Sequence, residues 1–321
     1  MAIDDGPTDD EGARAQEFHD ALGKRMRLSR LGVLLRSTSA IAYSTVAANH
    51  DGQPAAGSQM AADIEEVTAE VVGNVQRVCA AWHIVAVEQL RAVESVHAAG
   101  HLLFAASPLL RSVMEHAARI GWVLDGPTAT ARAARSWLAD VVSNGEDAIT
   151  HRNRGDPAPT LAGAPARLEE LCERTLPDLF GGERPDCRPS GRTSSWSFLG
   201  QQWGSNTLVA EGFFARRVHP RWGPETSGSV QYRVATMFAH PSTTATFALA
   251  DQEPGGADFE WDWQHTRTRV ISALACFQVV TLDLYGYLGW RPPELAAWND
   301  HFARFVAETN ARGPEAEADP R

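Results

Sequence analysis

The chain has 321 residues, of which 44% are hydrophobic, and a formal charge of −11 at pH 7. This length and apolar content are enough to bury one large core, so we expect one main domain. The negative charge argues against a general affinity for nucleic acid or for an anionic membrane, because long-range attraction to phosphate needs a positive surface. A local basic patch is compatible with that charge.

The two ends of the chain are too polar to fold. Residues 1–11 are acidic and lack the apolar region of a signal peptide, and no uninterrupted run of about 18 uncharged apolar residues occurs. We therefore expect a cytoplasmic protein without a membrane span, in which disordered ends (1–11 and 310–321) flank a single helical domain over 12–309. The four cysteines are widely spaced, which predicts reduced thiols rather than a zinc site or a disulfide framework.

The chain lacks residues that several enzyme classes need. Lys24 is the only lysine among the 29 lysines and arginines, and no glycine-rich turn precedes it, which argues against P-loop NTPases and lysine-imine enzymes. G-x-S-x-G and H-E-x-x-H motifs are absent, and no G-x-G-x-x-G follows a strand pattern. Hydrolase, zincin and dinucleotide-binding interpretations therefore lack their required parts.

Helical spacing of apolar residues begins near the N-terminus. Apolar residues recur every three to four positions over 12–37, and after a polar loop they do so again over 60–99. We expect one helix in the first range and a long helix in the second. Gly73 is the only interruption of the second pattern, so we expect that helix to be kinked or split there.

The next helix is expected to start at Ser107-Pro108. Serine accepts a hydrogen bond from the amides of a first helical turn, and proline fits the first helical position. This helix should run to Leu124, where Asp-Gly-Pro ends it. Another helix should begin at Thr128 or Thr130, and a short one should follow at about 164–175.

The helical spacing is lost between residues 177 and 227. Glycine and proline recur throughout this stretch, and Trp196, Trp203 and Trp222 are spaced among them. We expect an irregular Gly/Pro/Trp-rich insertion whose tryptophans pin it to the rest of the protein.

Helical spacing returns at about 229–250 and over 262–288. A Gly-Trp-Arg-Pro-Pro stop follows, and a last helix should run to about Glu308. No repeat of solenoid length and no run of alternating strands is present. The expected fold is therefore all-α, an up-and-down helix bundle elaborated by the insertion.

Charged residues cluster in the otherwise apolar helix expected over 107–124. Arg111, Glu115 and Arg119 are each four residues apart and share one face, while His116 lies about 100° round the helix from Glu115. One interpretation is an Arg–Glu–Arg ladder that only fixes helix packing. The other is that Arg111 and His116 converge on a phosphate-bearing ligand, with Glu115 holding the guanidinium in place.

A second segment, Tyr232-Arg233-x6-His240, repeats the arginine-then-histidine pattern. Together with Arg111-x4-His116 it resembles the R-x4-6-H signature of the HEPN superfamily, helical bundles that include many metal-independent ribonucleases. The resemblance implies that Arg111, His116, Arg233 and His240 are catalytic and need no metal or cofactor. Either histidine would be the base for a ribose 2′-hydroxyl, and the arginines would stabilise phosphoryl charge. It also implies RNA or a phosphate-bearing small molecule as partner, and a homodimer.

The same segments are similar to uncharacterised actinobacterial helical proteins. The shared patterns are R-x3-E-H-x2-R-x2-W at Arg111–Trp122, Y-R with a later H at Tyr232–His240, and Y-x-G-W at Tyr287–Trp290. This similarity implies a helical fold in which the segments pair, and it implies no activity. We expect Glu115, Arg119 and Tyr232 to contact the ligand.

The stretch Phe213–Trp222 interleaves cations with aromatic residues, as proteins that bind single-stranded nucleic acid do. Arg217, within it, is therefore a further candidate ligand contact. The alternative is a solvated loop that its aromatic side chains anchor.

Two other functions stay open. The first is a non-catalytic module for a small ligand or a protein, in which the same charges order the bundle. The second is a ferritin-like di-iron oxidase, which needs carboxylate-x-x-His pairs on helices. The residues that fit this pattern are Glu94 with His97, Asp262 with His265, and Glu65 or Glu66 upstream.

Overall fold

The computed structural model describes residues 32–38, 40–41, 53–98, 102–153, 162–187, 192–223, 232–233, 235–236 and 263–311. Helices dominate these residues, and the only sheet among them is a two-stranded hairpin, so the all-α prediction is confirmed. The first long elements are α2 (Gln59–Glu66), α3 (Ala69–Ala98), α4 (Leu102–Leu124), α5 (Ala129–Asn153) and α6 (Ala164–Glu170). After them come the π-helix η2 (Leu171–Thr175), α7 (Leu176–Leu179), the 3-10 helix η3 (Thr193–Ser195), β1 (Ser197–Phe198) and β2 (Gln201–Gln202). The chain continues through α8 (Asn206–Phe213), the π-helix η4 (Phe214–Val218), α9 (His219–Trp222), α12 (Trp263–Leu288) and α13 (Pro293–Ala311).

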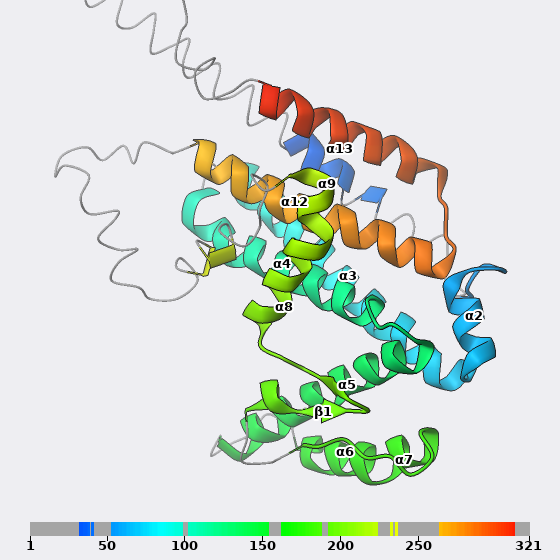
Figure 1. Cartoon of the computed structure of the whole chain (residues 1–321). Coiled ribbons are helices and arrows are strands. Elements are labelled where there is room, and N and C mark those ends of the chain that lie inside the picture. The colour runs from blue at the N-terminus through cyan, green and yellow to red at the C-terminus, as the bar shows by residue number, and fades with distance from the viewer. Residues whose placement is uncertain are drawn as a thin grey trace, which may run out of the picture.

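Helix α4 lies at the centre of the bundle. It packs along α3 on one side and along α12 on another, while α8 crosses it and α5 packs on α3 (Figure 1). The main core is formed by apolar side chains from these helices, including Val75, Leu90, Met114, Leu274 and Phe277. Helices α8, η4 and α9 follow one another as one column, in which α8 contacts α4 and η4 contacts α12.

A second, smaller core lies beyond α5. The β1–β2 hairpin and the α6–α7 segment cover one face of α5 (Figure 1). Trp196 and Phe198 are buried there in one cluster with Leu138. Trp196 therefore pins the insertion, as its position among glycines and prolines predicted. Cys172 and Cys187 both pack at the edge of this core.

Two predicted helix boundaries differ from the structure. The long second helix is divided at Val67 and Thr68, where the Thr68 hydroxyl accepts from the Val71 amide at 3.2 Å, and Gly73 lies inside α3. Helix α4 begins at Leu102, so Pro108 lies within it. The Ser107 hydroxyl accepts a hydrogen bond from the buried Arg269 guanidinium at 3.0 Å, which is a tertiary role in place of the expected cap.

The prediction of an irregular insertion is wrong for residues 206–222, which are helical. Ser205 caps α8 by accepting from the Leu208 amide at 3.3 Å, and Pro220 lies in the first turn of α9, directly after η4. Phe213 and Phe214 bury their side chains in the main core. Burial of these aromatics outweighs the low helix propensity of the glycines around them.

Other boundaries follow the sequence. The Thr128 hydroxyl accepts from the Ala131 amide at 3.1 Å at the start of α5, as predicted. Gly289, with φ of 72°, ends α12 at the expected stop. Helix α13 runs to Ala311, slightly beyond the expected end. Most of the helix expected over 12–37 and of that over 229–250, and the tails at 1–11 and 312–321, lie outside the described residues.

One segment, Thr268–Leu288 within α12, is long and apolar enough to cross a membrane by length and composition. However, 83% of its most apolar window is buried inside the fold. Its apolar character is therefore accounted for by packing against α4 and η4.

A buried carboxylate ties three helices together. Asp63 of α2 accepts from Arg132 of α5 at 2.7 Å, from Tyr287 of α12 at 2.9 Å and from Gln59 at 2.9 Å. Burial alone would raise the pKa of Asp63, but the hydrogen bonds from Arg132, Gln59 and Tyr287 outweigh it and hold that pKa below its usual value. The carboxylate therefore stays ionised and fixes α2 against α5 and α12.

The fully buried glycine Gly145 on α5 offers a test of this packing. A Cβ there would overlap the ring of Trp196, whereas a Cβ at Gly73 on α3 would meet no atom within 4 Å. We expect Gly145→Ala to lower the free energy of unfolding by about 1–3 kcal/mol through overpacking. Gly73→Ala should raise it by about 0.5–1 kcal/mol, because alanine favours a helix interior. Urea unfolding measures both changes, and a stabilising Gly145→Ala would contradict the packing described.

His83 should make stability depend on pH. Its Nε2 donates to the Thr281 hydroxyl at 3.0 Å, its ring stacks on Phe277, and burial lowers its pKa from 6.5 to about 4. As pH falls from 6.5 to 4, the unfolded chain takes up a proton that the folded chain excludes, so the free energy of unfolding should fall by about 3 kcal/mol.

His83→Gln keeps a donor for Thr281 and removes the titration. Urea unfolding of this variant should show a shallower loss of stability over the same pH range than the wild-type protein does. Identical pH profiles for the two proteins would count against the neutral, buried state of His83.

Candidate functional site

Tyr232, the first residue of the second arginine–histidine segment, contacts Glu115 of the first segment. Arg111 Nε donates to Glu115 Oε1 at 2.9 Å, and the Tyr232 hydroxyl, 117 residues away in sequence, donates to the same oxygen at 2.8 Å. The Arg111 guanidinium also lies 5.6 Å from the centre of the Tyr232 ring. We call Arg111, Glu115 and Tyr232 the Glu115 site.

The Glu115 site is partly exposed at the surface, and the protonation states of Arg111 and Tyr232 are fixed by their surroundings. The Arg111 and Glu115 side chains are each 20% exposed. Burial alone would lower the pKa of Arg111, but Glu115 outweighs this and raises it, while burial and Glu115 together raise the pKa of Tyr232. Arg111 is therefore a permanent cation, and the Tyr232 phenol keeps its proton.

Arg233, the residue after Tyr232, is at the surface. Its Nε donates to Glu211 of α8 at 3.0 Å, and its side chain is 70% exposed. The structure thus links the predicted Arg233 segment both to α4, through Tyr232, and to α8. His240 lies outside the described residues.

His116 is held in one tautomer. Its Nδ1 lies 2.7 Å from the carbonyl oxygen of Ser112, one helical turn earlier. A carbonyl can only accept, so Nδ1 carries the proton and Nε2 of the neutral ring carries the lone pair. The ring is half-buried, and Nε2 is therefore the nitrogen that could accept a proton from a ligand.

Arg119 attaches the insertion to α4 through hydrogen bonds. Its side chain is buried, its two Nη atoms donate to the carbonyl oxygens of Trp203 at 2.6 Å and Gly204 at 3.0 Å, and Nη2 also donates to Asn206 at 2.7 Å. Its guanidinium lies 3.6 Å from the centre of a Trp203 ring. Burial lowers the pKa of Arg119 to about 10, which still leaves it charged at neutral pH. These contacts assign Arg119 to the position of the insertion, in place of the ligand role expected from the sequence.

The structure places Arg217 in a different location. It bonds to Asp125, which follows the end of α4 and is about 20 Å along that helix from Arg111. Phe213 and Phe214 are buried, so they offer no face to a nucleic-acid base. The interpretation of Phe213–Trp222 as a stacking platform is therefore wrong for its first two aromatics, although its arginines are exposed.

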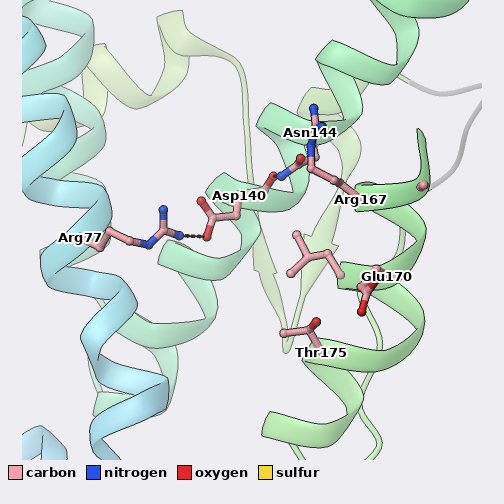
Figure 2. Close-up of a pocket in the computed structure, with 8 residues that line it drawn as sticks. Arg77, Asp140, Asn144, Arg167, Glu170 and Thr175 are labelled. Atoms are coloured by element: carbon pink, nitrogen blue, oxygen red, sulfur yellow. Dashed lines mark hydrogen bonds and ion pairs between the residues drawn. The ribbon is translucent and has the colours of Figure 1, made fainter. Parts of the chain in front are cut away.

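A polar pocket of about 460 Å³ lies between α3, α5 and the α6–η2 segment (Figure 2). Arg77, Asp140, Asn144, Arg167, Glu170 and Thr175 line it. Arg77 forms an ion pair with Asp140. Burial nevertheless raises the pKa of Asp140 above its usual value. Two arginines face two carboxylates, so the charges balance and give no preference for an anion. Sequence reasoning missed this pocket because its walls come from three helices.

The described residues contain no group of three or more His, Cys, Asp or Glu side chains that could hold a metal. Glu94 pairs with Arg36 at 3.5 Å, and Glu65 and Glu66 are exposed on α2. Asp262 and the side chain of His265 lie outside the described residues. The described residues therefore do not provide the set of iron ligands that the di-iron interpretation needs.

No protein-family model, curated protein or solved structure matches the chain. The resemblances to HEPN proteins and to actinobacterial helical proteins therefore stay predictions. The function has to be argued from the residues and contacts described above.

Arg119 provides a test of how the insertion is held. Arg119→Met would leave the Trp203 and Gly204 carbonyls and the Asn206 side chain without their donor, which should lower the free energy of unfolding by about 3 kcal/mol. Arg184→Met is the matched control, because Arg184 is 59% exposed and pairs only at the surface with Glu173. Urea unfolding, together with limited proteolysis over 192–206, should separate the two variants. Equal stability of the two would contradict the fastening role.

Proposed function

We propose that the protein binds a phosphate-bearing ligand through Arg111 and Arg233, and that this ligand is RNA, which the protein cleaves without a metal. The observation that carries the proposal is the meeting of Arg111 and Tyr232 on one oxygen of Glu115. This contact joins Tyr232, the residue before Arg233, to the helix that carries Arg111 and His116. Two segments more than a hundred residues apart in sequence can thereby contribute to one site.

The contacts at the Glu115 site suit phosphate recognition. Glu115 accepts from Arg111 Nε, which fixes the plane of the guanidinium. A planar guanidinium can donate two parallel hydrogen bonds to a phosphate, and Arg233, at 70% exposure, adds a second cation directly after Tyr232. Glu115 thus orients Arg111, and Glu211 holds Arg233.

In the proposed reaction a histidine removes the proton of a ribose 2′-hydroxyl. The 2′-oxygen then bonds to phosphorus as the bond from phosphorus to the 5′-oxygen breaks, and the leaving oxygen takes up a proton. His116 Nε2 carries the lone pair that this step needs, since Nδ1 donates to the Ser112 carbonyl. His240 is the alternative base, and Arg111 and Arg233 would stabilise charge on the phosphoryl oxygens.

The test uses end-labelled single-stranded RNA with the full chain in excess EDTA. We expect the wild-type protein to cleave it, and His116→Ala and His240→Ala to slow cleavage by about 10²-fold or more if each histidine transfers a proton. Arg111→Gln and Arg233→Gln should weaken RNA binding in fluorescence anisotropy. Arg91→Gln is the matched control, because Arg91 is 56% exposed on α3 and pairs there with Glu88.

The proposal is wrong if the wild-type protein neither binds nor cleaves RNA. It is also wrong if the two histidine variants leave every measured activity intact. Cleavage by Arg91→Gln at the wild-type rate would show that general loss of positive charge does not explain the other variants.

A second candidate function is a non-catalytic binding protein, in which the Glu115 site only orders the bundle. It is favoured by the same hydrogen bonds, because they attach Tyr232 to α4. In that case Glu115→Gln should cost about 3–5 kcal/mol, by leaving Arg111 without its carboxylate, and should leave RNA affinity unchanged. Thermal melting and anisotropy on the same variant distinguish the two functions.

A further inference from the structure

Three arginines line a pocket at the end of α4 that is distinct from the Glu115 site. Arg216 and Arg217 of η4 and Arg221 of α9 surround about 400 Å³, together with Pro220 and with Val279 and Asp283 of α12. We call this the arginine pocket. Its volume lies in the range of pockets that hold small molecules.

The arginine pocket has an excess of positive charge. Its three arginines face two carboxylates, Asp283 in its lining and Asp125 beside it, in a chain whose net charge is −11. The pocket of Figure 2 has balanced charges by comparison. An anion would therefore gain more from entering the arginine pocket.

The protein holds each guanidinium from one side. Arg217 Nε donates to Asp125 at 2.8 Å, Arg216 Nε lies 3.6 Å from the same carboxylate, and Arg221 donates to Asn299 at 3.2 Å. The three side chains nevertheless stay exposed, with Arg216 at 60% and Arg217 at 40%. The guanidiniums are thus partly ordered before a ligand arrives, which lowers the entropy cost of binding.

The π-helix η4 explains how the arginines come together. Phe214 and Val218 are buried at its two ends, which directs Arg216 and Arg217 away from the core. Arg221 follows Arg217 by four residues and so lies on the same side of the η4–α9 column. π-Helices are rare, and many of them occur at functional sites.

Asp283 is the negative group of the pocket. Within the described chain its Oδ2 accepts no hydrogen bond, and the Arg217 Nη1 atom lies 3.9 Å away. Burial raises its pKa, as does Asp125, while Arg217 and Arg221 act in the opposite direction. The Asp283 charge should therefore oppose an incoming anion, and its removal should strengthen anion binding.

We propose that the arginine pocket binds the phosphate group of a small organic phosphate. A phosphomonoester has three terminal oxygens and can therefore engage three guanidiniums, whereas a carboxylate has two oxygens in one plane. The exposed Pro220 in the lining offers an apolar surface for the organic part. Because Arg111 and Arg233 take no part in it, this inference does not depend on the proposed function.

The experiment is isothermal titration of the full chain with ribose 5-phosphate, inorganic phosphate and malonate in low-salt buffer. We expect both phosphates to bind and malonate to bind at least about tenfold more weakly, since it lacks a tetrahedral group with three oxygens. Tighter binding of ribose 5-phosphate than of inorganic phosphate would support an organic ligand. Equal affinity of the two would overturn the organic part of the proposal.

The variants avoid Arg217, which is paired with Asp125. The double variant Arg216→Gln, Arg221→Gln should lose at least tenfold in phosphate affinity, and Asp283→Asn should gain affinity. Arg91→Gln, on α3 and outside both proposed sites, should bind phosphate as the wild type does. The RNA test relies on variants outside the arginine pocket, so failure of this inference and failure of the proposed RNA activity are distinguishable. Unchanged affinity in the double variant, with an unchanged melting temperature, would overturn the proposal.

Discussion

The charges on α4 must find partners inside the protein, and this constraint organises the molecule around the candidate site. An unpaired buried ion costs several kcal/mol, so Arg119 is compatible with folding only because the Trp203 and Gly204 carbonyls and Asn206 accept its donors. These acceptors lie more than 80 residues away in sequence. Satisfying one guanidinium therefore places the insertion across α4. Glu115 acts in the same way on Tyr232, the residue before Arg233.

The same rule recurs away from the candidate site. Asp63 holds Arg132 and Tyr287, and thereby joins α2, α5 and α12, while Arg269 donates to Ser107 between α12 and α4. Buried charged side chains thus join helices, because their donors and acceptors form hydrogen bonds within the protein. Arg216 and Arg221 differ, because they are exposed and are held by the protein from one side only. This contrast separates residues suited to a ligand from residues that maintain the fold.

Predictions from sequence succeeded where the deciding interactions are local. Thr128 caps α5 and Gly289 ends α12, because each acts on residues within one helical turn. They failed where a distant partner changed the role of a residue. Ser107 resembled a cap, yet its hydroxyl serves Arg269, 162 residues away. Residues 206–222 resembled a loop by their glycines and prolines, yet burial of Phe213 and Phe214 against the core keeps them helical.

The sequence by itself determined the all-α class, the strong helices α5 and α12, and the charged face Arg111–Glu115–Arg119, since periodicity and caps act over one or two turns. Only the tertiary structure decided the partner of each charge. It made Arg119 a fastener, joined Glu115 to Tyr232, and grouped Arg216, Arg217 and Arg221 into a pocket with Asp283. The physical reason is that the energy of a buried or clustered charge depends on which groups surround it. Those groups come from helices that are distant in sequence.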